Sequence, residues 1–276
     1  MPIHYPVVDL PLARRLERAE GLANAAYVDA RRDVQPEVGA EWIETSGTLA
    51  MFDGPASPIT QTFGLGLDQS FTAASLDQIE QFFTARSAPT AHEICSFVSP
   101  MALNLVSARG YSPIEASIVL VRPTALPLPA GSSRVTVHEI GENETPVWAR
   151  TAGLGWGSES AELAAVVEGF GAVIGRARNS QCFLAELDGA PVAAGALNVS
   201  NGIALFAGAS TIPAARRQGA QQALLQARLA FAAARDIALA MVVTAPGSAS
   251  QRNAERQGFR PVYARSKWQL TVRRET

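Results

Sequence analysis

The stretch TIPAARRQGAQ, residues 211–221, is the most informative part of this 276-residue chain. It joins an apolar segment expected to be a strand, 203–209, to an apolar segment with helical spacing, 219–235. Backbone N–H groups at the start of a helix lack partners inside the helix, and the helix dipole adds partial positive charge there. Gly219 lets a ligand approach the backbone closely, and two arginines precede it. The stretch therefore predicts a site for a phosphate or diphosphate group.

The stretch fits neither of two common nucleotide-binding patterns, G-x-x-x-x-G-K-S/T and G-x-G-x-x-G. It resembles the acetyl-CoA loop of the GNAT superfamily of N-acetyltransferases, whose pattern is R/Q-x-x-G-x-G/A and which here reads RRQGAQ at 216–221. Gln221 departs from the pattern, because the family has a small residue there. Ile212 and Pro213 are similar to the end of the family's splayed fourth strand.

A second feature lies downstream. A strand is expected at 238–244 and a short helix at 251–257, and Gly258 and Phe259 follow that helix. This order is similar to the GNAT segment that flanks the pantetheine arm. The resemblance covers residues 134–272, and it implies an α/β (α+β) fold with a mixed, mostly antiparallel twisted sheet flanked by helices.

The resemblance also implies which residues bind acetyl-CoA, with no metal involved. Backbone N–H groups of 217–221 would hold the diphosphate, and the backbone of Ile212 would pair with the pantetheine amides as an added strand. The expected cofactor-binding residues are Ile212, Arg216, Arg217, Gln218, Gly219, Ala220, Gln221 and Asn253.

The implied reaction is N-acetylation. A small-molecule or peptide amine would attack the thioester of acetyl-CoA directly in a ternary complex, with a base and an acid moving protons. Many relatives carry a tyrosine acid four residues before the glycine of Gly-Phe, where this chain has Ala254, and a glutamate on the strand entering the loop, which this chain lacks. Tyr263 is the substitute candidate for the acid. The missing groups favour an alternative function, a catalytically silent acyl-CoA-binding sensor or regulatory module.

The chain has the organisation of two related domains. GYSPIEAS at 110–117 matches GFRPVYAR at 258–265 in its glycine, aromatic, proline, β-branched and alanine positions. Each copy follows an expected strand and short helix, which favours an internal repeat. Three prolines lie between 122 and 133, as in a linker. We expect a degenerate GNAT-like domain at 1–124, a linker at 125–133 and an acetyl-CoA-binding GNAT domain at 134–276.

The loop of the first half that corresponds to 211–221 reads GLGLDQSFT at 64–72. It contains glycines but no arginine, and the carboxylate of Asp68 would repel phosphate. We therefore expect that the N-terminal domain does not bind CoA.

Hydrophobic periodicity and turn residues predict the remaining elements. Turns are expected at Asp188-Gly189 and Asn201-Gly202, which would make an antiparallel meander. Further helices are expected at 10–31, 76–86 (with Ser75 and Gln78 as a capping box), 102–109, 145–153 and 160–176. Further strands are expected within 41–52 and at 59–66, 92–98, 114–121, 135–140, 182–187, 192–199 and 259–272.

Composition excludes several classes of function. A net charge of −2 and a pI of about 6.0 argue against nucleic-acid binding, which needs a basic face. No apolar run approaches the roughly 20 residues of a membrane helix, and the N-terminus lacks the features of a secretory signal, so a cytoplasmic protein is expected. Cys95 and Cys182 lie far apart and suit neither zinc nor a disulfide. A homodimer is left open.

Overall fold

The computed structural model of the chain describes residues 4–129, 134–157 and 161–270, without the side chains of 161–166. Its α-helices are α1 (Leu10–Val34), α2 (Ala73–Thr84), α3 (Pro100–Ala108), α4 (Thr145–Trp156), α5 (Ala161–Ile174), α6 (Ala220–Ala233) and α7 (Ala249–Arg256). Its strands are β1 (Glu41–Thr45), β2 (Thr48–Phe52), β3 (Gln61–Phe63), β4 (Ala91–Cys95), β5 (Tyr111–Pro123), β6 (Val135–Glu139), β7 (Ser180–Leu187), β8 (Ala190–Ser200), β9 (Ile203–Thr211), β10 (Leu239–Thr244) and β11 (Arg260–Leu270). Predicted features at 130–133, 160 and 271–272 lie outside the described residues.

Contacts divide the chain into two compact units. The C-terminal unit is Leu120–Arg260 with the segment that ends at Tyr5, and the N-terminal unit is Pro6–Val119 with the strand from Pro261 onward. This division differs from the predicted boundaries at the last strand. The reason is that β11 pairs antiparallel with β4 of the N-terminal unit, in a register that runs from Arg265 opposite Cys95 to Gln269 opposite Ala91.

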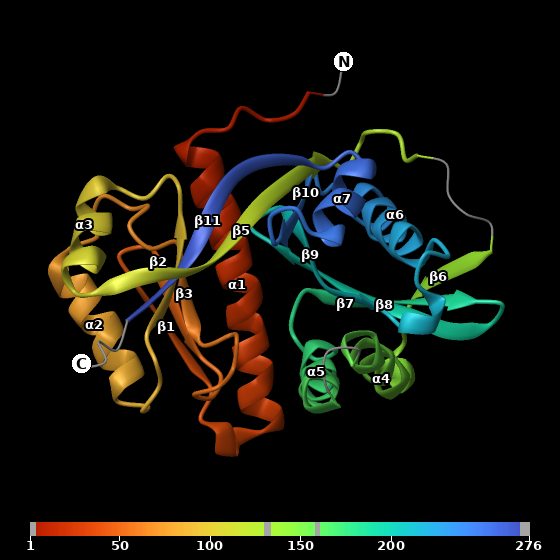
Figure 1. The fold of residues 1–276 in the computed structure, drawn as a ribbon, viewed down its shortest axis with the longest axis horizontal. Helices are drawn as coiled ribbons and strands as arrows, with labels where there is room; N and C mark the ends of the chain where they lie inside the picture. The colour runs from red at the N-terminus through yellow and green to blue at the C-terminus, as the bar shows by residue number, and fades with distance from the viewer. Residues whose placement is uncertain (1–3, 130–133, 158–160, 271–276) are drawn as a thin grey trace. The chain divides into compact units, whose positions relative to one another are not determined.

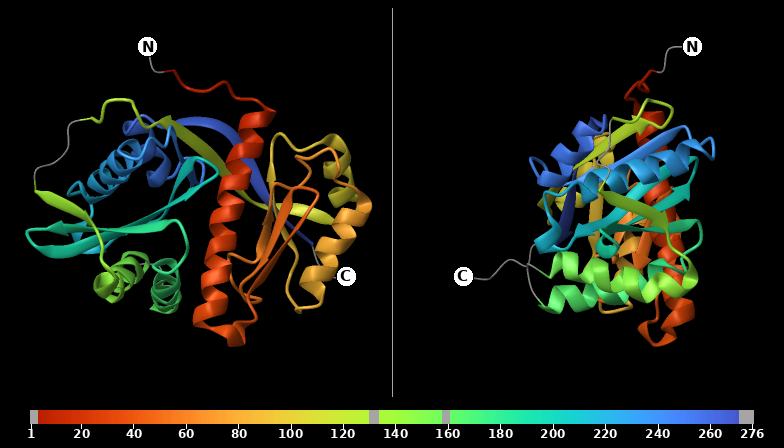
Figure 2. Two further views of the ribbon diagram at one scale, coloured as in Figure 1. Left: turned by 180° about the vertical axis from the view of Figure 1, so that it is seen from behind. Right: turned by 90° about the vertical axis from the view of Figure 1, so that its right-hand side faces the viewer.

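The C-terminal unit is a sheet between two layers of helices (Figure 1). β7, β8 and β9 form the predicted antiparallel meander. β6 pairs antiparallel with β7, and β10 is parallel to β9. Positive φ angles at both residues of the turns Asp188-Gly189 and Asn201-Gly202 close the two hairpins, as their sequences predict. Two views agree that α4 and α5 cover one face of this sheet and α6 the other (Figures 1 and 2).

One aromatic side chain anchors α4 to the sheet. Trp148 is buried, and its indole N–H donates to the carbonyl oxygens of Phe183 at 3.0 Å and Gly195 at 3.3 Å. Burial of an indole N–H without a hydrogen-bond partner costs free energy. These two bonds therefore hold α4 against β7 and β8.

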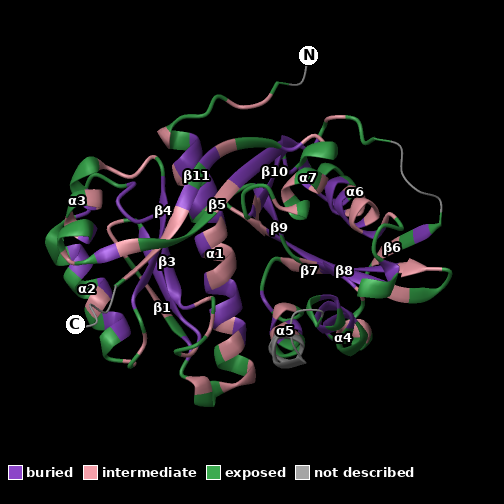
Figure 3. Cartoon of the chain, in the orientation of Figure 1, coloured by how far each residue is buried: buried purple, intermediate pink, exposed green. Residues whose placement is uncertain are grey.

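The N-terminal unit has a comparable order of elements. β1, β2 and β3 are antiparallel, β3 is parallel to β4, and β11 lies between β4 and β5. α1 covers one face of this sheet and α2 and α3 the other, and the buried residues concentrate on the strands in both units (Figures 1 and 3). The mixed, mostly antiparallel sheets flanked by helices confirm the predicted fold class.

The start of α2 differs from the prediction. The N-cap is Thr72, which forms a capping box with Ser75, whereas the sequence pointed to Ser75 and Gln78. Phe71 and Leu76 are both buried in one cluster and flank this cap as a hydrophobic staple, so packing moves the start three residues earlier. The strand predicted at 59–66 shortens to β3, because Gly64 and Gly66 turn the chain with positive φ.

Candidate functional site

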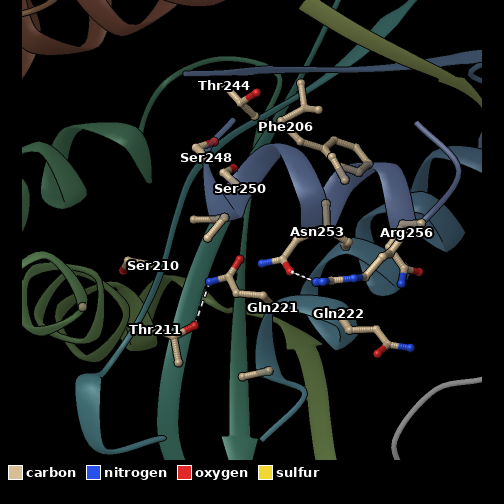
Figure 4. A pocket seen from close by; sticks show the side chains of 18 of the residues that line it. Phe206, Ser210, Thr211, Gln221, Gln222, Thr244, Ser248, Ser250, Asn253 and Arg256 are labelled. Atoms are coloured by element: carbon tan, nitrogen blue, oxygen red, sulfur yellow. Dashed lines mark hydrogen bonds between the residues drawn. The ribbon is translucent and has the colours of Figure 1, made fainter. Parts of the chain in front are cut away.

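A cavity of about 1220 Å³ opens in the C-terminal unit. It exceeds the roughly 300–1000 Å³ typical of small-molecule pockets, so it has room for a large ligand. Its walls come from β9, the loop after β9, α6, the end of β10 and α7 (Figure 4). The site thus lies where the sequence placed the loop 211–221.

Two parallel strands separate at this cavity. β9 and β10 are in register from Ile203 opposite Leu239 to Phe206 opposite Val242, and both strands continue beyond the last of these pairs. Residues 207–211 of β9 line the cavity. A strand edge without a strand partner presents N–H and C=O groups that an extended ligand can bind.

A β-bulge lies in the same stretch of β9. The register with β8 shifts between Ala194 and Ala196, which oppose Ser210 and Ala207. The three steps from Ala207 to Ser210 thus face two steps on β8, and Gly208 takes up the extra residue with φ of +59°. Bulges re-aim backbone and side chains and are frequent beside active sites.

The loop after β9 leads directly into α6. A 3-10 turn, Pro213–Ala215, is followed by Arg217 and Gly219, whose φ values are +64° and +91°. Gly219 is the N-cap, and without a side chain it makes no side-chain cap hydrogen bond. The first helical bond after it runs from Ala223 N to Gly219 O, so the N–H groups of the first turn are available to an anion.

Arginine dominates the charge of the cavity. The charged residues that line it are Arg216, Arg217, Arg228 and Arg256, and no Asp, Glu or His is among the lining residues that the structure describes. The Arg216 side chain is committed to structure, because Nη2 donates to Gly155 O at 3.0 Å and Nε to Thr211 O at 3.3 Å. It ties the loop to the end of α4.

Most of the predicted cofactor-binding residues meet at this cavity. Six of the eight line it: Arg216, Arg217, Gly219, Ala220, Gln221 and Asn253. Gln218 does not, and its amide lies 3.4 Å from Ala214 O.

The backbone of Ile212 has partners inside the protein. Its N–H donates to Val192 O and its carbonyl accepts from Ala215 N, both at 2.9 Å. The N–H is therefore used inside the protein, whereas the carbonyl oxygen keeps a second lone pair for a ligand. The strand edge that lines the cavity is 207–211, just before Ile212.

Two polar side chains fix the geometry beside the loop. The Gln221 amide donates to Thr211 Oγ1 at 2.7 Å, which gives the residue that departs from the family pattern a structural contact. Asn253 Oδ1 accepts from Arg256 at 3.1 Å, so it is the amide nitrogen of Asn253 that is left for a ligand (Figure 4).

Tyr263 does not line the cavity. It is buried in the N-terminal unit, where its hydroxyl donates to Glu17 Oε1 at 2.8 Å and its ring packs edge-on against Phe97. Burial, and then the charge of Glu17, raise the pKa of Tyr263 well above its usual value. This placement argues against the predicted role of Tyr263 as the catalytic acid.

The corresponding loop of the N-terminal unit is filled with its own side chains. Leu65, Leu67 and Phe71 are buried, and a Cβ added to Gly66 would lie 2.4 Å from that of Ala102. The Thr72 side chain caps the start of α2, whereas the N-cap of α6, Gly219, has no side chain to do so. Packing as well as charge therefore disfavours an anion at this loop.

Phe206 and Arg228 are among the lining residues that the sequence did not single out. Phe206 looks like any apolar strand residue. In the sequence Arg228 interrupts an apolar helix segment, which is a signal, and the structure shows that it is buried, with 1% of its surface exposed.

Replacing Arg217 tests the loop. Because Arg217 holds a left-handed φ, Arg217→Gly is expected to stabilise the free protein by roughly 0.5–1 kcal/mol, the relief of strain less the entropy cost of glycine. It also removes a cation from the cavity, so the dissociation constant for acetyl-CoA should rise. Arg217→Ala is the control that loses the cation and keeps the strain. Unchanged affinity in both variants, measured by calorimetry, would contradict this assignment.

Two further features of the described residues bear on the kind of site. They contain no group of three or more His, Cys, Asp or Glu side chains that could hold a metal ion. None of their helices is long and apolar enough to span a membrane.

Comparison with known proteins agrees with this geometry. The family model of the acetyltransferase (GNAT) family matches residues 151–259. A GCN5-related N-acetyltransferase from Kribbella flavida has a similar structure, with a TM-score of 0.62 at 18% identity over 89% of this chain and 95% of that chain. The same kind of protein from Sphaerobacter thermophilus gives 0.54 at 16% identity, over 83% and 75%.

A tandem GNAT protein from the clavulanic acid biosynthesis pathway gives a TM-score of 0.53 at 12% identity, over 83% of this chain and 81% of that chain. At these identities the likeness concerns the fold. None of the curated protein sequences matches this chain. Residues 151–259, which include the strands that separate and the loop at the start of α6, form a domain of the acetyltransferase (GNAT) family.

Proposed function

We propose that the C-terminal unit transfers an acetyl group from acetyl-CoA to the primary amine of a small molecule or peptide. The observation that supports this most is the combination of two features in one cavity. The strands β9 and β10 separate there, and the uncapped start of α6 lies beside them with arginines and no carboxylates around it.

The cavity suits a ligand with an anionic end and an extended, amide-bearing arm. The N–H groups at the start of α6 would hold the diphosphate, and the edge of β9 at 207–211 would pair with the arm. Acetyl-CoA supplies a thioester, which is an activated acetyl group. An N–H on the same edge would polarise its carbonyl.

The transfer needs few side chains. The amine nitrogen attacks the thioester carbon, the C–N bond forms, the C–S bond breaks, and its electron pair leaves on sulfur. Because no Asp, Glu or His is among the described lining residues, we propose that water takes the proton from the amine. A thiol pKa of about 8–9 allows the thiolate to leave without a dedicated acid. The rate should therefore rise with pH until the acceptor amine is deprotonated.

The alternative is a silent acyl-CoA sensor. It is favoured by Ala254, which stands where many relatives have tyrosine, and by the lack of a glutamate on β9. The two functions predict the same binding and different turnover.

The deciding experiment measures free thiol released from acetyl-CoA in the presence of mixed amines, amino acids and peptides. An acetyltransferase is expected to release thiol only when an acceptor is present, with the acetylated product visible by mass spectrometry. Stabilisation by acetyl-CoA without thiol release for any acceptor class would favour the sensor.

For the rest of the chain we infer a degenerate GNAT-like repeat at 1–124, joined by a linker at 125–133 to the GNAT domain at 134–276. Gly110 and Gly258 hold matching positions in the two copies, with φ of +88° and +83°. Ser117 and Arg265 also match, and they lie in contact, with Arg265 Nε donating to Ser117 Oγ at 3.1 Å.

A further inference from the structure

A single buried arginine connects α6 to the bulge of β9. Arg228 has 1% of its surface exposed, and its guanidinium lies 4.8 Å from the ring centroid of Phe206, the last residue of β9 paired with β10. Nη1 donates to Ala196 O on β8 at 2.9 Å and, more weakly, to Ala207 O on β9 at 3.5 Å. Nε donates to Leu224 O one turn back along the helix.

The contacts of Arg228 coincide with the register shift. Ala196 and Ala207 face each other on one side of the shift, and Ala194 and Ser210 face each other on the other side. The residue between the two β8 positions, Gly195, leaves the space for the guanidinium, because a Cβ there would lie 3.2 Å from Arg228 Cζ. The bulge, the glycine and the arginine therefore fit together as one local arrangement.

Burying the charge of Arg228 costs free energy, and a neutral side chain at this position would avoid that cost. Burial lowers the pKa of Arg228 to about 9, and no carboxylate in the described part of the chain raises it again. An apolar residue of similar size is often neutral or stabilising in place of a buried charge. What an apolar side chain cannot do is donate hydrogen bonds to carbonyls of two strands at once.

We propose that Arg228 is a positioning residue, whose guanidinium links β8 and β9 at the bulge and so fixes the edge 207–209 that faces the acyl donor. The proposal rests on the proposed acyl transfer for its kinetic effects. Arg228 need not touch the reacting atoms. It sets the direction of the N–H groups on β9, and displacements of about 1 Å in such groups can cost about 100-fold in rate.

The first test replaces Arg228 by methionine, which keeps the length of the side chain and removes its donors. Arg228→Met is expected to fold, to bind acetyl-CoA within about threefold of wild type, because the diphosphate loop is intact, and to lose about 10- to 100-fold in kcat. Arg228→Lys should also lose rate, because a single ammonium cannot reproduce the fork of the guanidinium.

A second variant reaches the same contact from the other side. Gly195→Ala keeps the arginine in the sequence, but the added Cβ would push its guanidinium away from the bulge. This variant should therefore also lower kcat. Arg122→Met is the matched control. Arg122 is equally buried and also binds carbonyl oxygens, those of Gln257, Pro123, Leu126 and Pro127, so its loss should lower stability and leave kcat within about twofold.

A measurement without turnover separates this proposal from the proposed function. In Arg228→Met, amide hydrogen exchange at 207–209 should accelerate at least tenfold, while exchange at 203–206, in the paired part of β9, should not change. Added guanidinium ion should partly restore the protection in Arg228→Ala. Wild-type exchange and wild-type kcat in Arg228→Met would overturn the proposal. No thiol release by wild type, with accelerated exchange in the variant, would overturn only the transferase function.

Discussion

Gly219→Glu is expected to abolish the stabilisation that acetyl-CoA gives to the wild-type protein. Gly219 holds φ of +91°, where a side chain is strained, and it is the N-cap beside which the diphosphate would lie. A carboxylate there repels the diphosphate. At about 100 times its dissociation constant, acetyl-CoA should stabilise wild type by about 2.7 kcal/mol and the variant by close to zero.

The control for this experiment is Gly189→Glu. Gly189 also holds a left-handed φ, +81°, in the exposed turn between β7 and β8, and a Cβ there meets nothing within 4 Å. Both variants should lose stability in the free protein through strain, measured as a lower melting temperature. Only the Gly189 variant should keep the full response to acetyl-CoA. An equal response in the two variants would show that the ligand does not bind at the start of α6.

Glu17→Gln is expected to stabilise the protein above pH 7 by about 3 kcal/mol and to have little effect near pH 4. Glu17 is fully buried, and burial raises its pKa to about 7, with the charge of Glu20 adding to the rise and Arg265 opposing it. Three carboxylates, Glu17, Glu20 and Glu93, surround Arg265, and Glu17 Oε2 has no hydrogen-bond partner. The Tyr263 hydroxyl donates to the other carboxylate oxygen of Glu17, Oε1.

The sign follows from proton binding. Between pH 4.5 and about 7 the folded protein holds a proton on Glu17 that the unfolded chain has lost, so stability decreases as pH rises through this range. The rise in pKa from 4.5 to about 7 corresponds to about 3 kcal/mol, at 1.36 kcal/mol per pH unit. Glutamine cannot ionise, and its side-chain oxygen can still accept from Tyr263. The decrease in stability with rising pH should therefore disappear in the variant.

Denaturant unfolding at pH 5, 6, 7 and 8 measures this effect. Glu44→Gln serves as the control, because Glu44 forms an exposed ion pair with Arg18 and should change stability by less than about 1 kcal/mol at each pH. A Glu17→Gln variant less stable than wild type at pH 8 would show that the carboxylate is ionised and paired with Arg265 instead.

The loop at 216–221 and the Gly-Phe after α7 were enough to predict the family, because the order of strand, glycine loop and helix is local and encodes an anion site. The turns at Asp188-Gly189 and Asn201-Gly202 determined the meander in the same way, since residues that tolerate positive φ leave few alternatives. These features depend on residues that are neighbours along the chain, so local patterns were sufficient to predict them.

The site beyond the loop depended on tertiary contacts. The sequence pointed to Tyr263 as a candidate for the catalytic acid. In the structure β11 pairs with β4, and this pairing buries Tyr263 against Glu17. Arg228 looked like an interruption of an apolar helix, and only packing against the bulge of β9 shows what its guanidinium contacts. Strand pairing and buried polar contacts join residues far apart in the chain, and their energies depend on burial, which no local pattern records.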